Sequence, residues 1–131
     1  MKTFRTSTYS IPCAGLTGHR KVTFAVLADL HGLVFGQNHQ TLYKAIIDAN
    51  PDAILVAGDM VVHGSTETLE AAAGLFLRLC EIAPVFYVLG NHEYKMYLNP
   101  DTRNLYLNYE KLLTSAGICF FTSSMFVMTF F

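Results

Sequence analysis

The sequence predicts an α/β fold, in which βαβ units build a parallel sheet packed against helices. Short, nearly continuous apolar runs alternate along the chain with longer segments whose apolar residues recur at helical spacing. Alternating strands and helices are typical of right-handed crossovers between parallel strands. The length of 131 residues suits one domain, and no internal repeat or low-complexity linker divides it.

Four apolar runs are predicted to be strands. The first three are typical of a parallel sheet whose strands are covered on both faces. A further segment, Thr3–Ile11, is a candidate edge strand that turns through Gly15 and Gly18. The four predicted strands are Val22–Leu27, Ala53–Ala57, Val85–Leu89 and Ile118–Phe121.

Three segments between these strands carry amphipathic helical patterns. Each follows a polar residue that can cap its first turn, and the last stops at a glycine suited to the position after a helix. They are residues 38–49 after a candidate N-cap at Asn38, residues 65–80 with Ser65 or Thr66 as the cap, and residues 101–117 between Asp101 and Gly117.

Composition excludes several classes of protein. Nine Lys and Arg against ten Asp and Glu give a net charge of −1, which excludes a basic nucleic-acid-binding patch. Apolar residues make up 52% and charged residues only 15%, so neither disorder nor a coiled coil is expected. Three cysteines without CxxC spacing imply neither a disulfide framework nor a cysteine-based zinc site. Free thiols fit a reducing compartment, and a cytoplasmic location is predicted.

Neither end of the chain predicts insertion into a membrane. Residues 1–21 lack the uninterrupted apolar stretch of a signal peptide. Residues 112–131 are uncharged and close to the ~20 residues that span a bilayer, but Ser, Thr and Gly interrupt them and no basic anchor follows. A membrane anchor is therefore not expected.

Residues able to carry chemistry follow three of the predicted strands, at the point where each strand ends. Because the carboxyl ends of parallel strands meet at one edge of the sheet, these side chains are expected to gather there. Successive groups are separated by about one βα unit. The groups are Asp29 and His31 after the first strand, Asp59 after the second, and Asn91 with His92 after the third.

These residue types suit metal ions. Asp29 and His31, two residues apart, can bind one cation through oxygen and nitrogen. The carboxylate of Asp59 can bridge two metals about 3.5–4 Å apart, the spacing of two-metal phosphoester sites. Asn91 offers a neutral oxygen to a second metal, which leaves His92 free to act on a substrate. Oxygen and nitrogen donors without thiolate favour Mn²⁺, Fe or Zn²⁺.

The motifs Asp-x-His, Gly-Asp and Gly-Asn-His-Glu, in this order on successive strands, resemble the first three blocks of the calcineurin-like metallophosphoesterases, most of all their small bacterial members. The resemblance covers about residues 22–118, and the block Gly90–Glu93 is its most specific part. It implies the N-terminal half of a four-layered α/β/β/α sandwich. Residues 1–131 are therefore expected to be a single partial domain whose tail, residues 119–131, is off pattern.

The resemblance also implies a reaction, the hydrolysis of a phosphomonoester or phosphodiester with two divalent or trivalent metal ions. A metal-activated hydroxide would attack phosphorus, while His92 would steady the developing charge and protonate the leaving oxygen. Glu93 is expected to hold His92 or the loop rather than touch metal. The implied ligands are Asp29 and His31 for the first metal, Asp59 as the bridge and Asn91 for the second metal.

The sequence departs from the family pattern after this block. In the family a second half supplies a lone histidine and a Gly-His-x-His block that complete both metal shells, whereas no histidine follows His92 here. The other histidines, His19, His39 and His63, lie earlier and match no motif. The Phe- and Met-rich tail predicts a truncated or frame-shifted end, and weak or no activity is expected. Downstream DNA without a Gly-His-x-His block would contradict this.

Simpler interpretations of the same residues stay open. The polar groups can be two helix N-caps, Asp29 and Asp59, a turn residue, Asn91, and two loop histidines, His63 and His92. The chain can also be a non-catalytic interaction module that retains the fold, although such a module has no physical reason to hold five costly polar groups at one edge. In an oligomer, a second chain can supply the missing histidines.

Overall fold

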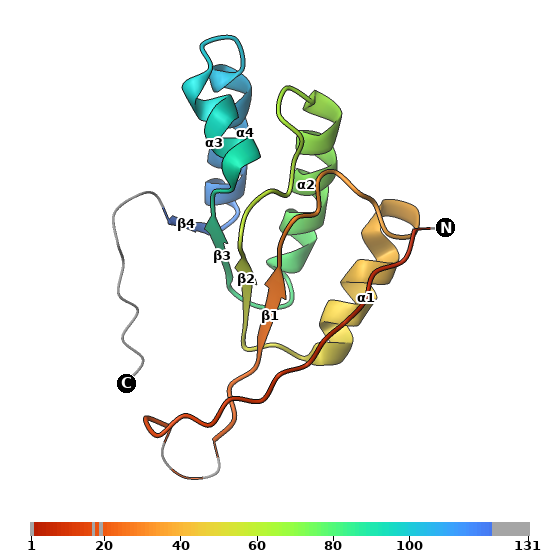
Figure 1. Ribbon diagram of the computed structural model, residues 1–131, viewed down its shortest axis with the longest axis vertical. Coiled ribbons are helices and arrows are strands. Elements are labelled where there is room, and N and C mark those ends of the chain that lie inside the picture. The colour runs from red at the N-terminus through yellow and green to blue at the C-terminus, as the bar shows by residue number, and fades with distance from the viewer. Residues whose placement is uncertain (1, 17, 19, 122–131) are drawn as a thin grey trace.

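The computed structural model describes residues 2–16, 18 and 20–121 (Figure 1). It confirms the predicted α/β class, because strands and helices alternate along the described chain. The strands are β1 (Phe24–Leu27), β2 (Ala53–Val56), β3 (Val85–Val88) and β4 (Cys119–Phe121). The helices are the 3-10 turn η1 (Gln37–His39), α1 (Gln40–Ala49), α2 (Thr66–Leu79), α3 (Asn91–Leu98) and α4 (Arg103–Ser115).

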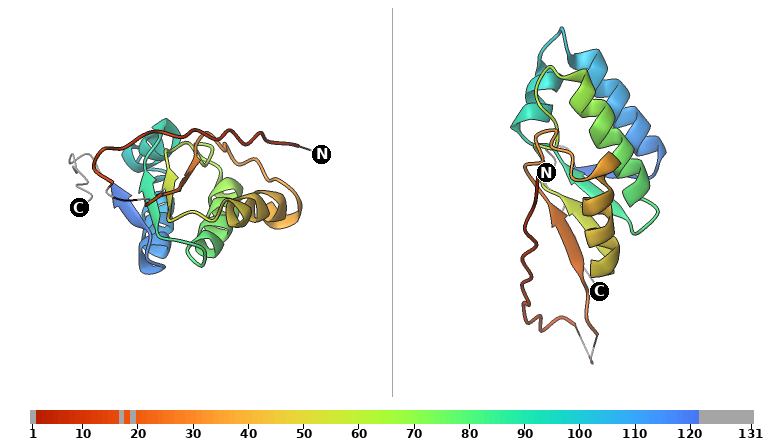
Figure 2. Two further views of the ribbon diagram at one scale, coloured as in Figure 1. Left: turned by 90° about the horizontal axis from the view of Figure 1, so that it is seen from below. Right: turned by 90° about the vertical axis from the view of Figure 1, so that its right-hand side faces the viewer.

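The strands form one parallel sheet in sequence order, β1-β2-β3-β4. Its register aligns Leu27 with Val56, Val56 with Tyr87, and Tyr87 with Phe120. When parallel strands follow one another in order through right-handed crossovers, all connecting helices lie on the same face of the sheet. Figure 2 shows this arrangement for α1, α2 and α4, which lie on one side of the strands, with the N-terminal segment on the other.

The sheet is therefore buried on one face only. Ile54, Val56 and Tyr87 point toward the helices and are at most 1% exposed. On the opposite face, Val26 is 63% and Val88 is 47% exposed. The prediction of strands covered on both faces is thus wrong for the residues described, because an apolar run shows that both sides of a strand are apolar but not that both are covered.

Each helix packs on the sheet through one face, and in α2 this is the face that the apolar spacing predicts. In α4, Leu105 and Leu112 fit the helical spacing but are 38% and 48% exposed, while Tyr106 is buried. Leu42 and Ile46 of α1 are buried, as are six residues of α2 and three of α4. Each fully buried Leu or Phe contributes roughly 1.5–3 kcal/mol relative to an exposed position. Ser65 caps α2, since its Oγ accepts the Thr68 N–H at 3.2 Å, and Gly117 follows α4 with a φ of 98°. Both predicted helix boundaries are confirmed.

Other local predictions are wrong. Asn38 is not the N-cap of α1: the helix begins at Gln40 behind His39, and both Asn38 and His39 have left-handed backbones. Arg78 holds this turn from α2 by donating to the Asn38 carbonyl at 2.8 Å, a long-range contact that no local pattern reveals.

The candidate edge strand Thr3–Ile11 is also absent, since residues 2–16 contain no strand. In its place Phe4 packs edge-on against Phe35, with ring centroids 5.1 Å apart. Helix α3 is an element that the helical pattern did not predict, because its eight residues are too few to show a clear period.

Strand β4 confirms the predicted strand at 118–121, while residues 122–131 lie outside the described residues. Residues 122–131 are half of the uncharged segment 112–131 that was considered above as a membrane anchor. Within the described part of the chain, no helix has both the length and the apolar composition needed to cross a bilayer.

His39 predicts a dependence of stability on pH. Burial, and secondly the charge of Arg78, lower the pKa of His39 from its ordinary 6.5. The unfolded chain therefore binds the proton more readily, so the folded state loses stability as pH falls below about 6.5. Between pH 7.5 and 5.5 we expect the free energy of unfolding in urea to fall more in the native protein than in His39→Asn, by up to ~1.4 kcal/mol. Asn tolerates the left-handed backbone. Equal falls in both proteins would contradict this assignment.

Candidate metal centre

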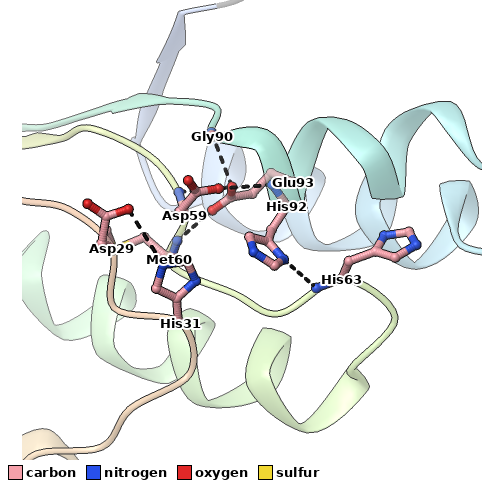
Figure 3. Close-up of polar contacts among 8 residues, drawn as sticks. All are labelled: Asp29, His31, Asp59, Met60, His63, Gly90, His92 and Glu93. Atoms are coloured by element: carbon pink, nitrogen blue, oxygen red, sulfur yellow. Dashed lines mark hydrogen bonds and ion pairs between the residues drawn. The ribbon is translucent and has the colours of Figure 1, made fainter.

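Three loops meet at the carboxyl edge of the sheet, one after each of β1, β2 and β3 (Figure 3). The first two are joined by backbone hydrogen bonds that continue the ladder of the strands. Asp29 N–H donates to the Gly58 carbonyl at 3.1 Å, and His31 N–H donates to the Asp59 carbonyl at 3.0 Å. The predicted convergence of these loops is therefore present in the backbone itself.

The second and third loops touch through two glycines. A Cβ placed on Gly58 would collide with the backbone nitrogen of Gly90, and Gly58 has a φ of +85° that favours glycine. A Cβ placed on Gly90 would collide with the backbone nitrogen and the carboxylate of Asp59. Neither position has room for a side chain, so the glycines set how closely the loop carrying Asp59 approaches α3.

The carboxylate of Glu93 binds the second loop to the third. Glu93 is completely buried. One carboxylate oxygen accepts the N–H groups of Asp59 (3.0 Å) and Gly90 (3.1 Å). The other accepts the Met60 N–H and the Tyr87 hydroxyl, both at 2.8 Å. Of the two roles expected for Glu93, the structure shows that it holds the loops, with no hydrogen bond to His92.

Tyr87 supports this carboxylate from within β3. Its hydroxyl donates to Glu93 and in turn accepts from the hydroxyl of Tyr109 on α4 at 3.2 Å. Burial above all, with the nearby Tyr109 and Glu93, holds the pKa of Tyr87 well above its ordinary range. The hydroxyl therefore keeps its proton and stays a donor. The alternation of β3 places Tyr87 on the helix side, and a buried tyrosine hydroxyl normally needs a partner, which is the signal that could have revealed this contact.

The two carboxylate oxygens of Asp59 have different surroundings. Its Oδ1 accepts the N–H of His92, in the first turn of α3, at 2.9 Å. The carboxylate therefore caps a helix, but this helix is α3 and not the one that follows Asp59 in sequence. Oδ2 has no hydrogen-bond partner among the described residues. One oxygen is thus committed to structure and the other is available to a ligand.

Asp29 and His31 form an exposed pair. Asp29 Oδ1 lies 3.5 Å from His31 Nε2, and the two side chains are 70% and 42% exposed. Within the described chain Asp29 caps no helix. Asp29, His31 and Asp59 all have left-handed backbones, with φ of 54°, 47° and 54°. Such residues cost about 1–3 kcal/mol each and tend to cluster at functional sites.

His92 lies between these groups and a fourth segment. Its Nδ1 accepts the backbone N–H of His63 at 3.1 Å, and its ring meets the His31 ring edge-on at a centroid distance of 5.0 Å. Because Nδ1 accepts, the ring proton resides on Nε2. His63 is exposed, as the simpler interpretation held, but its backbone orients His92. Sequence gives no signal for a backbone contact of this kind. Asn91 is the exposed first residue of α3.

The side chains at this edge are of the types that bind a divalent cation, but too few of them lie together to hold one. Aspartate and imidazole without thiolate suit Mn²⁺, Fe or Zn²⁺. However, no three His, Cys, Asp or Glu side chains among the described residues form a group that could hold a metal ion. The structure supplies the pair Asp29 and His31, the unpartnered oxygen of Asp59, and Asn91 at the start of α3.

Comparison with known families decides the relationship. The model of a family described as calcineurin-like phosphoesterase matches residues 22–127, which is most of the chain. The chain belongs to the calcineurin-like phosphoesterases. Comparisons with curated proteins and with solved structures gave no match. The resemblance to this metal-dependent phosphoesterase family, drawn from the three motifs, is therefore confirmed. Within the matched region, the described residues form the parallel sheet and its three converging loops.

Replacing Glu93 by Gln tests the contact that joins the loops. Each Glu93 oxygen accepts two hydrogen bonds, and in Gln one oxygen becomes an N–H₂ group that cannot accept. Two hydrogen bonds are lost, and their buried donors are left unpaired. We expect the free energy of unfolding in urea to fall by roughly 2–4 kcal/mol. Glu81→Gln is the matched control, because Glu81 is exposed, and should change it by less than about 0.5 kcal/mol. Similar values for both variants would show that the Glu93 contacts contribute little.

Two Gly→Ala substitutions should have opposite effects. In Gly90→Ala the new methyl group would push against Asp59, at a cost of about 1–3 kcal/mol in the free energy of unfolding. Gly74 lies inside α2, and a Cβ there meets no atom within 4 Å. Gly74→Ala should therefore stabilise the protein by about 0.5–1 kcal/mol. Thermal unfolding of both variants measures the pair, and a stable Gly90→Ala would contradict the close approach.

Proposed function

We propose that this chain carries the metal-binding edge of a phosphoester hydrolase. The observation that supports the proposal most directly is the set of left-handed backbones at Asp29, His31 and Asp59, on two loops tied by hydrogen bonds. Strained polar residues tend to cluster at functional sites, and here three of them lie on two adjoining loops.

In the proposed site Asp29 and His31 would hold one metal, Asp59 would be shared between both, and Asn91 would hold a second. Their oxygen and nitrogen donors suit Mn²⁺, Fe or Zn²⁺. When bound, such ions make water a better nucleophile and neutralise charge on phosphoryl oxygens. The chain's own contribution is to hold these donors in place through Glu93, and to hold the Asp59 carboxylate through the His92 N–H.

His92 is the proposed catalytic residue. Its Nε2–H can donate to a phosphoryl oxygen and steady the charge that develops there. The His63 N–H keeps the ring in this tautomer. To protonate the leaving oxygen as well, the ring would have to carry a proton on both nitrogens and release the bond from His63. The geometry therefore favours stabilisation of charge as the first role of His92.

We expect these 131 residues alone to hydrolyse phosphoesters slowly or not at all. Besides the shared Asp59, the chain offers two donors to the first metal, Asp29 and His31, and one to the second, Asn91. No histidine follows His92 in the sequence. Loss of ligands or their supports typically costs 10–100-fold in metal affinity or activity. Vigorous, EDTA-sensitive turnover of p-nitrophenyl phosphate or bis-p-nitrophenyl phosphate with Mn²⁺ would contradict this, unless light scattering shows an oligomer in which a second chain completes the site.

The second candidate is a non-catalytic interaction module that retains the fold. It is favoured by the absence, among the described residues, of a three-residue group able to hold a metal. A module of this kind would bind no Mn²⁺. Asp29 and His31 are exposed to solvent, so added metal can reach them and its binding can be measured.

Calorimetric titration with Mn²⁺ separates the two candidates. We expect the native chain to bind Mn²⁺ and Asp59→Asn to bind at least about tenfold more weakly. Asn retains an oxygen that can accept the His92 N–H, so the cap on α3 is preserved. Asp48→Asn, on the exposed ion pair with Lys44 in α1, is the control and should bind like the native chain. Absence of binding by the native chain would favour the interaction module. Equal binding by Asp59→Asn and Asp48→Asn would show that Asp59 is not a metal ligand.

A further inference from the structure

A hollow of about 210 Å³ is lined by Asp29 but by none of the other proposed donors. It lies where the N-terminal segment passes the end of β1 and the loop that leads to η1. Its walls include both apolar and charged side chains. Among them are Phe4, Arg5, Asp29, Leu30, Phe35 and Leu42.

The inner wall of the hollow is apolar and belongs to the hydrophobic core. Leu30, Phe35 and Leu42 belong to the hydrophobic core and are at most 9% exposed. Phe4 closes the wall from the N-terminal segment, where its ring packs edge-on against Phe35 and against the core. This contact fixes the segment at the hollow although the segment forms no strand.

Arg5 follows directly and lines the same hollow. Its side chain is exposed and makes no hydrogen bond or ion pair with any described residue, although Asp29 also lines the hollow. A guanidinium carries five donors in a planar fork that matches phosphate oxygens. The hollow thus has an apolar interior and the unpaired guanidinium of Arg5. It adjoins the proposed metal centre, because Asp29 belongs to both.

We propose that this hollow binds the apolar leaving group of a phosphoester, with Arg5 donating to the phosphate. The inference rests on the function proposed for Asp29 and adds a substrate class to it. A cavity of ~150 Å³ holds a benzene ring, so the hollow accepts one aromatic ring or an alkyl group of similar size.

Binding measured without metal or turnover tests the proposal. With EDTA present, phenyl phosphate should bind at least about tenfold more tightly than methyl phosphate, because only the phenyl ring buries apolar surface. Arg5→Gln should weaken both ligands by about tenfold, and Arg5→Lys should restore part of the loss. Arg20→Gln is the control, since Arg20 is also exposed but does not line the hollow. Magnetisation transfer from the phenyl protons to the methyl groups of Leu30 and Leu42 should locate the ring.

Equal binding of the two phosphates, equal effects of Arg5→Gln and Arg20→Gln, or transfer to other methyl groups would each overturn the proposal. These failures are separate from failure of the proposed function. If Mn²⁺ binds and depends on Asp59 while phenyl phosphate shows no preference, the metal centre stands and the subsite is wrong. If phenyl phosphate binds through Arg5 while Mn²⁺ does not bind, the assignment of the hollow to a leaving group is wrong.

Discussion

The carboxylate of Glu93 is the contact on which the arrangement of this protein depends. It accepts four hydrogen bonds while completely buried, from two backbone groups of the second loop, one of the third loop and one tyrosine hydroxyl. A buried carboxylate is tolerated only when donors surround it. The loop carrying Asp59 and the start of α3 therefore form together with Glu93 or not at all. The first loop then joins through its backbone bonds to Gly58 and Asp59.

This arrangement holds strained residues in place. Left-handed backbones at three proposed ligands cost about 1–3 kcal/mol each, and hydrogen bonds between the loops offset that cost during folding. The donors are then positioned before any ligand arrives, which lowers the entropy that binding must overcome. The same logic explains why glycine occupies positions 58 and 90, where bulk would separate the loops.

Much of the fold could be predicted from the sequence because it rests on local periodicity. The apolar runs that became β1 to β4, the cap at Ser65 and the glycine at 117 are all read within a few residues. The convergence of the three loops followed from parallel topology alone. What sequence could not supply depends on distant partners, such as the turn at Asn38 held by Arg78, or the segment at Phe4 held by Phe35. The roles of the five proposed site residues stay predictions.

The carboxylate of Asp59 joins the edge of the sheet to α3 through Oδ1, while Oδ2 accepts no hydrogen bond from the described residues. A ligand that draws its carboxylate toward Oδ2 weakens the bond from Oδ1 to the His92 N–H, and with it the start of α3. Helix α3 lies on α4 through Tyr97 and Tyr106, whose rings meet edge-on at 5.8 Å. If a cation binds Oδ2 of Asp59, its binding and the stability of the start of α3 are therefore coupled through this one carboxylate.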